Sequence, residues 1–301
     1  MKTKRLSLCK IAAILLCGIA AGVSVGKGQV TPKSFEKINI GNYSAVVDAA
    51  RKGLKEHSPK ITIAFTAHSD ITDDIEEIAK SVMEDALADT QEATEGDYIR
   101  FQYGGYETRY SYVEDGGQFK YTVKLIPYYY TDLEQEAYVS EQIAQIIDSF
   151  AFDADTSDYE KVKTVYDYIY KQVAYDRVHQ YQETNHLKTT AYAALKYHTA
   201  VCQGYSVLLY RMLREVGVDA RVITGTGVMD EKSEFHAWNI VRIDGVYYNL
   251  DVTWGKALET DQFFLKSDAH FEGHLREDRY NTREFRERYV MSDRDYEIPN
   301  P

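Results

Sequence analysis

The spacing of apolar residues divides the second half of the chain into a helix and a following pair of strands. Apolar residues at helical intervals predict a helix over 202–216, which Gly217 ends. Further on, apolar runs flank Asp244-Gly245, a residue pair that favours the type I′ turn of a hairpin. The pattern therefore predicts a helix followed by an antiparallel hairpin.

The predicted hairpin brings a histidine and an aspartate onto one face of the sheet. Closing the hairpin at its turn places His236 opposite Thr253 and Trp238 opposite Asp251. Because side chains alternate between the two faces, these four residues share one face. His236 and Asp251 become diagonal neighbours, roughly 7 Å apart or less between Cβ atoms, so that their side chains can form a hydrogen bond. A carboxylate in this position holds an imidazole in one tautomer.

Cys202 stands at the start of the predicted helix and supplies a third group. The positive end of a helix dipole favours the thiolate, which is the nucleophilic form of cysteine. Cys202, His236 and Asp251 therefore predict a nucleophile, its base and the residue that orients the base. The alternative is that Cys202 is a small core residue.

These motifs resemble the core domain of the transglutaminase-like superfamily, whose members are papain-like cysteine enzymes. The resemblance covers about residues 157–271 and consists of VCQGYS, RVITG, HAWN, LDVTW and FFLKSD, the last of which is similar to bacterial members. It implies an α+β fold, with a nucleophile helix packed on an antiparallel sheet, and a catalytic triad of Cys202, His236 and Asp251. Gln203 stands where animal protein-crosslinking transglutaminases have tryptophan, which argues against protein crosslinking.

The first 26 residues are typical of a signal peptide. Basic residues precede an apolar stretch over about 11–25, which is shorter than the roughly 20 residues of a membrane span. We therefore expect a secreted or cell-surface protein, and an N-terminal anchor that is not cleaved is the alternative. Residues 27–130 are expected to form a small α+β domain, and residues 131–301 the transglutaminase-like catalytic domain.

Capping pairs, alternation and turn residues predict the elements outside these motifs. Capping boxes are expected at Asp73–Glu76, Thr131–Glu134 and Ser157–Glu160. The predicted helices lie at 45–55, 74–88, 132–149, 157–173 and 190–197, and the predicted strands at 61–67, 98–103, 106–113 and 118–127.

Charge and cysteine content narrow the classes of function. Removal of the signal leaves 31 basic and 47 acidic residues, a net charge of about −16, which argues against binding to nucleic acid or anionic membranes. Cys9 and Cys17 leave with the signal, so that Cys202 becomes the only thiol and no internal disulfide can form. An unpaired cysteine in an exported chain indicates a reactive thiol or a bond to another chain.

Two other groups of residues fit metal sites poorly, and we expect neither a metal nor a cofactor. Asp153, Asp155 and Asp158 lack the glycine and the glutamate that a calcium loop requires. His270 and His274 have ligand spacing, but the usual zinc motif places its glutamate directly after the first histidine. The 26 tyrosines indicate strand packing rather than a platform for ligands.

Three functions remain compatible with the sequence. They are a thiol peptidase or amidase acting on protein or cell-wall peptide, an acyltransferase that crosslinks or deamidates protein glutamine, and a non-catalytic binding module of the same fold. In the enzymes the Cys202 N–H would stabilise the oxyanion, and Gln203 or a tyrosine upstream is the candidate second donor. Trp238 is expected either to shield the site or to pack in the core. The oligomeric state is not predicted.

Overall fold

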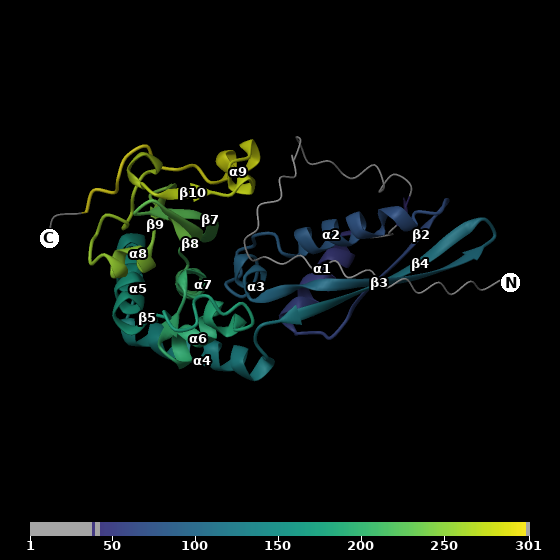
Figure 1. Cartoon of the computed structure of the whole chain (residues 1–301), viewed down its shortest axis with the longest axis horizontal. Coiled ribbons are helices and arrows are strands. Elements are labelled where there is room, and N and C mark those ends of the chain that lie inside the picture. Colours follow the sequence, from purple (N-terminus) through teal and green to yellow (C-terminus); the bar gives the residue numbers. More distant parts are fainter. Residues whose placement is uncertain (1–37, 40–42, 299–301) are drawn as a thin grey trace. The chain divides into compact units, whose positions relative to one another are not determined.

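The computed structural model describes residues 38–39 and 43–298, which form two compact units (Figure 1). Unit 1 contains the described residues up to Asp89 together with Tyr103–Tyr129, and unit 2 contains Thr90–Gln102 and the chain from Tyr130. Unit 2 thus includes a segment that the sequence assigns to the N-terminal domain. The expected signal peptide, or anchor, lies outside the described residues. Within them, no helix is both long and apolar enough to cross a bilayer.

Unit 1 is an antiparallel sheet with two helices. Its strands follow the order β1-β2-β4-β3, and β3 and β4 form a hairpin around Gly116 and Gly117, whose φ angles of 60° and 77° suit glycine. The predicted helix over 45–55, strand over 61–67 and hairpin are confirmed. The elements are β1 (Ile38–Asn39), α1 (Tyr43–Lys55), β2 (Ile61–Ala67), α2 (Ile75–Ala86), β3 (Tyr103–Asp115) and β4 (Gln118–Tyr129).

The capping box predicted from Asp73 and Glu76 is wrong. A 3₁₀ helix at Thr72–Asp74 precedes α2, and no side chain caps α2. Asp70 instead accepts a hydrogen bond from the backbone N–H of Thr72 at 2.9 Å. Asp70 therefore forms an Asx-turn with Thr72, two residues further on, ahead of the helix.

The long helices of unit 2 begin at capping boxes. In α5 (Asp158–Gln172) the predicted pair Ser157–Glu160 is confirmed. In α4 (Leu133–Phe150) the box is Asp132–Gln135, one residue later than predicted. Thr131 is a poor cap here because its hydroxyl donates to Glu136 at 2.6 Å.

One predicted strand of unit 2 is a helix. Residues 98–103 were expected to form a strand, but α3 (Asp97–Arg100) covers the first half of this range, and β3 begins only at Tyr103. Its first residue, Asp97, is buried and accepts hydrogen bonds from the Arg221 guanidinium at 2.7 and 2.9 Å and from the Val222 N–H at 2.8 Å. A contact between residues 124 positions apart thus overrides the local strand preference of Tyr98-Ile99.

The centre of unit 2 is helix α7 (Cys202–Glu215) packed on an antiparallel sheet of order β10-β7-β8-β9 (Figure 1). All residues of α7 except Glu215 are buried. Asn239 links the two layers, because its amide donates to the carbonyl oxygens of Ser206 at 3.0 Å and Arg221 at 3.1 Å. The predicted α+β fold, with a nucleophile helix on an antiparallel sheet, is confirmed. The strands are β7 (Ala220–Met229), β8 (Lys232–Ile243), β9 (Val246–Leu250) and β10 (His274–Arg276).

Short elements complete unit 2. They are β5 (Ala174–Tyr175), α6 (Ala191–Lys196), β6 (Thr199–Ala200), α8 (Val252–Ala257) and α9 (Arg283–Arg288), with 3₁₀ helices at His186–Thr189, Asp268–His270 and Asp278–Tyr280.

The hairpin of β8 and β9 is shorter than predicted. Its turn at Asp244-Gly245 is confirmed, but pairing stops at Asn239 and Leu250. Asp251 therefore has no partner across the ladder, and Thr253 lies in α8 rather than on a strand. The expectation that both share a sheet face with His236 is wrong.

Candidate active site

Cys202 is held at the start of α7 by close packing. It is the first residue of the helix and follows Val201. The backbone of Val201 is extended, and its apolar side chain does not cap the helix. The next turn approaches the backbone so closely that a Cβ on Gly204 would lie 3.0 Å from the Lys188 carbonyl oxygen and 2.7 Å from the Ala200 Cβ. Glycine in CQGYS is therefore a requirement of packing that fixes where the thiol lies. Cys202 is a free, buried cysteine.

His236 lies on β8, where it pairs with Gly225 of β7. Its side chain is buried, and its Nε2 lies 2.7 Å from Oδ2 of Asp251. Cys202 lies near enough to the imidazole to contribute to the raised pKa of His236. Because Nε2 faces the carboxylate, Nδ1 is the ring nitrogen available to the sulfur. The structure therefore brings the three predicted residues together in the predicted order.

Asp251 has two tasks, one for each oxygen. Oδ1 caps α8 and accepts hydrogen bonds from the backbone N–H groups of Thr253 at 2.8 Å and Trp254 at 3.1 Å. Oδ2 faces His236. An aspartate at an N-cap is a strong local signal, so that LDVTW positions its carboxylate through the helix start rather than through the strand register. The predicted contact with His236 is confirmed, although the predicted route to it is not.

The pair of His236 and Asp251 favours opposite charges. Burial alone lowers the pKa of His236, but the charge and hydrogen bond of Asp251 outweigh burial, and Cys202 adds to them, so that the pKa rises to about 10. Burial raises the pKa of Asp251, whereas His236 and then His274 hold it below its ordinary value. At neutral pH the imidazolium and the carboxylate are the stable forms, which is the state that supports a neighbouring thiolate.

His274 is a further histidine of this site, and the sequence did not predict it as a partner of Asp251. Its Nε2 lies 3.0 Å from Oδ2 of Asp251, and its Nδ1 lies 3.1 Å from the Glu272 carbonyl oxygen. His270 and His274, whose motif fits a zinc site poorly, lie in different elements: His270 ends a 3₁₀ helix and His274 begins β10, with Gly273, at φ of 79°, between them. His270 contacts Asp295 instead, at 3.1 Å.

Two tryptophans enclose the imidazole of His236. The ring of Trp254, in α8, stacks on it with centroids 4.7 Å apart. Gly227 of β7 makes room for this ring, since a Cβ there would lie 2.7 Å from the indole. Trp238, which was expected to shield the site or pack in the core, is 1% exposed, and its ring centroid lies 6.1 Å from that of His236. It therefore does both.

The two candidates for a second oxyanion donor differ in their surroundings. The side-chain amide of Gln203 donates to the Phe101 carbonyl oxygen at 2.9 Å, so that Gln203 anchors the segment around α3. Tyr175, upstream of the cysteine, lies in β5 and pairs with Ala200, two residues before Cys202. Burial and then the charge of Cys202 raise the pKa of the Tyr175 hydroxyl. The hydroxyl thus lies within the electrostatic reach of the thiol.

His236, Asp251 and His274 also form a possible donor set for a metal ion. One ligand atom of each lies within 4.8 Å of the others, and imidazole nitrogen with carboxylate oxygen suits zinc. A bound ion would replace the hydrogen bonds that orient the base. The expectation that the chain uses no metal stays a prediction.

Comparison with known proteins identifies the region that carries this site. The family model of the transglutaminase-like superfamily matches residues 148–252, which include Cys202, His236 and Asp251. Kyphoscoliosis peptidase of Mus musculus is 31% identical over 130 residues, and that of Homo sapiens is 29% identical over the same length. Each match covers 39% of this chain and 20% of the relative, so that the chain spans about a fifth of those proteins.

A solved structure described as that of a TGase is also similar. The similarity covers 50% of this chain and 45% of the other, with 22% sequence identity and a TM-score of 0.36.

Proposed function

Because residues 148–252 form a transglutaminase-like superfamily domain, we propose that this protein is a thiol hydrolase that cleaves amide bonds of proteins or peptides through a thioester. The observation that carries the proposal is the buried pair of His236 and Asp251, 2.7 Å apart, with Cys202 near enough to help raise the pKa of the imidazole. These are the groups that nucleophilic catalysis by a thiol requires: a nucleophile, a base and a residue that orients the base.

In the proposed reaction the Cys202 thiolate attacks the carbonyl carbon of an amide, and a carbon–sulfur bond forms as the carbonyl oxygen becomes an oxyanion. The His236 imidazolium then gives its Nδ1 proton to the amide nitrogen, the carbon–nitrogen bond breaks, and the amine leaves. Water attacks the resulting thioester while His236 takes a proton from it. The carbon–sulfur bond then breaks, the carboxylic acid leaves, and the Cys202 thiolate stands again beside a His236 imidazolium that keeps the proton taken from water.

The oxyanion needs donors at the start of α7. The first N–H groups of a helix have no acceptor within the helix, so the Cys202 N–H can point at the developing charge. We propose the Tyr175 hydroxyl as the second donor, since the charge of Cys202 acts on it, whereas the side-chain amide of Gln203 already donates to the Phe101 carbonyl oxygen. Each such donor contributes about 10²–10³-fold to the rate.

We favour hydrolysis over transfer for two reasons. Gln203 replaces the tryptophan of protein-crosslinking enzymes, and the relatives with about 30% identity are named as peptidases. The proposed substrate is a protein or a cell-wall peptide. We also propose that the enzyme acts outside the cytoplasm, because residues 1–26 are typical of a signal peptide. Sequencing the N-terminus of protein recovered from medium and from cell envelopes tests the location.

The reaction is tested by incubating the protein with casein and with purified cell-wall peptide, each with and without a labelled primary amine. New N-termini or released amino acids indicate hydrolysis, whereas incorporation of the amine indicates an acyltransferase. Cys202→Ala is the control, and it must abolish both products together with labelling by a thiol-directed probe. Labelling or product formation that persists in Cys202→Ala would exclude the proposed nucleophile.

A further inference from the structure

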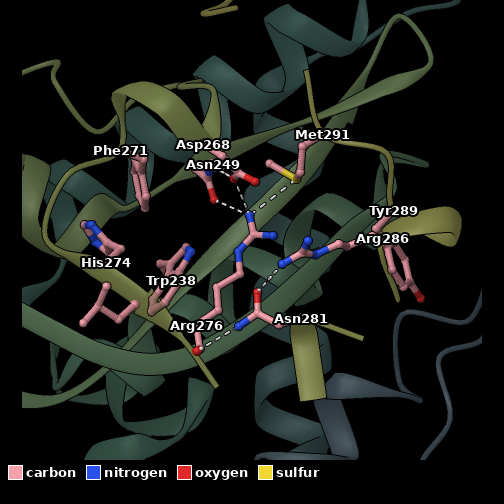
Figure 2. A pocket seen from close by; sticks show the side chains of 11 residues that line it. Trp238, Asn249, Asp268, Phe271, His274, Arg276, Asn281, Arg286, Tyr289 and Met291 are labelled. Carbon is pink, nitrogen blue, oxygen red and sulfur yellow. Dashed lines mark hydrogen bonds and ion pairs between the residues drawn. The ribbon is translucent and has the colours of Figure 1, made fainter. Parts of the chain in front are cut away.

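A cavity of about 550 Å³ lies in unit 2 (Figure 2) and shares His274 with the candidate active site. Its size is within the range of small-molecule sites. Strands β8, β9 and β10 and the segment around α9 supply its lining, and Cys202 is not part of it. His274 and Trp238 form the boundary between the cavity and the proposed catalytic residues. Both line the cavity, while His274 contacts Asp251 and Trp238 stacks near His236.

Two guanidinium groups project into one side of this cavity. Nη2 of Arg276 donates to Oδ1 of Asn249 at 2.9 Å and to Oδ1 of Asp268 at 2.7 Å. Arg286 donates only a long hydrogen bond, of 3.4 Å, to Asn281, and it forms no ion pair with any residue that the structure describes. Figure 2 shows the two guanidinium groups next to each other. The cavity thus contains two arginines and a single carboxylate, that of Asp268, whose side chain is 56% exposed.

The lining of the cavity thus carries more positive than negative charge, with Arg276 largely buried and Arg286 exposed to solvent. Burial lowers the pKa of Arg276, Asp268 opposes that effect, and the charge of Arg286 lowers the pKa again. An anion between the two guanidinium groups would replace this repulsion by attraction. Arg276 uses Nη2 for all its side-chain contacts among the described residues, so that Nε and Nη1 are available to such an anion. A guanidinium group can donate two parallel hydrogen bonds to the two oxygens of a carboxylate.

The other side of the cavity is aromatic. Phe271 and Trp238 lie there, and their ring centroids are 6.3 Å apart. The indole Nε1 of Trp238 is buried without a hydrogen-bond acceptor in the described part of the chain. In Figure 2 this nitrogen lies on the ring edge nearer to Arg276. Because this nitrogen is itself buried, the cavity offers a ligand an apolar wall and two cations.

We propose that this cavity binds a small carboxylic acid with an aromatic or apolar body. Arg276 and Arg286 hold the carboxylate, and Phe271 and Trp238 contact the body of the ligand. Binding here does not require the Cys202 thiol, although the cavity shares His274 and Trp238 with the candidate active site.

Isothermal titration calorimetry of the full chain tests the site, with phenylacetate as the probe and phenylacetamide as the uncharged analogue. We expect phenylacetate to bind and the amide to bind at least tenfold more weakly, because only the acid pairs with the arginines. Inorganic phosphate is the third arm, since it has charge but no apolar body. Phosphate binding as tight as that of phenylacetate would overturn the proposal, as would equal binding of acid and amide.

Two glutamine variants on α9 distinguish the cavity from general surface charge. Arg286→Gln removes a cavity cation, and Arg283→Gln makes the same charge change at a side chain that is 84% exposed and pairs with Glu287. We expect about 10- to 100-fold weaker binding of phenylacetate by Arg286→Gln, and a change of less than about twofold for Arg283→Gln. Equal effects of the two variants would overturn the proposal. So would the absence of binding by the unmodified chain at about 10 mM phenylacetate, where even millimolar affinity is detected.

Discussion

Asp251→Asn should remove activity while leaving the fold in place, because the two oxygens of Asp251 have separate tasks. The asparagine Oδ1 can still accept the hydrogen bonds of Thr253 and Trp254 that cap α8. Its Nδ2, however, is a donor and can no longer accept from His236. The imidazole must then present an unprotonated Nε2 to the amide and a protonated Nδ1 to Cys202, which is the wrong tautomer for a base. In a triad this change lowers kcat by about 10³- to 10⁴-fold.

The comparison variant is Asp251→Ala, which removes both tasks. Loss of an N-cap costs about 1 kcal/mol of stability, so that the alanine variant should unfold at a lower urea concentration than the asparagine variant. Activity is measured as kcat/KM for release of amine from a peptide substrate, and the rate of alkylation of Cys202 by iodoacetamide at neutral pH provides a readout that needs no substrate. The assigned roles would be refuted if Asp251→Asn kept more than a tenth of kcat/KM. They would also be refuted if Cys202 in this variant were alkylated at an unchanged rate.

The pairing of His236 with Asp251 also predicts how stability depends on pH. The pKa of His236 is raised to about 10 in the folded protein, above its ordinary value of 6.5. The folded state therefore gains stability that is complete below pH 6.5 and is lost as the pH rises towards about 10. Urea unfolding of the unmodified protein should show this loss, and unfolding of Asp251→Asn should show less of it. A stability difference between the two that does not change between pH 6 and about 10 would contradict the linkage.

Three further outcomes follow from the site. Tyr175→Phe should lower kcat by about 10²-fold with little change in KM if its hydroxyl stabilises the oxyanion, whereas a rise in KM alone would assign it to substrate binding. His274→Asn should lower kcat/KM less than Asp251→Asn and shift the pH profile, and an unchanged pH profile would leave His274 a packing role. Gly204→Ala should destabilise by about 1–3 kcal/mol in urea unfolding because of the contacts at 2.7–3.0 Å; stabilisation by the better helix propensity of alanine would contradict the packing.

Local signals predicted the elements that carry Cys202 and His236. The helix stop at Gly217 has φ of 81°, and the turn residues Asp244 and Gly245 have φ of 51° and 89°, so these residues determine the backbone near themselves. The likeness of the surrounding motifs to the transglutaminase-like superfamily then gave the correct fold class, as the match over residues 148–252 confirms.

The features that sequence reasoning missed depend on distant contacts or on competing local signals. The helix at Asp97 depends on Arg221, which is 124 positions away. His274 reaches Asp251 because β10 pairs with β7, a pairing that no short-range pattern encodes. The end of the strand at Leu250 was predictable in principle, since an aspartate before a short helix is a capping signal, but the alternation of the hairpin outweighed it.

The short helix α8 carries both the carboxylate that orients His236 and the indole that stacks on it. Fraying of these few residues would therefore remove both the Asp251 hydrogen bond and the Trp254 stacking from His236, even while the core of unit 2 stays intact. Catalytic competence would then follow the opening of one helical turn rather than the unfolding of the domain. Mild denaturant or heat that opens α8 would therefore remove the proposed activity before unit 2 as a whole unfolds.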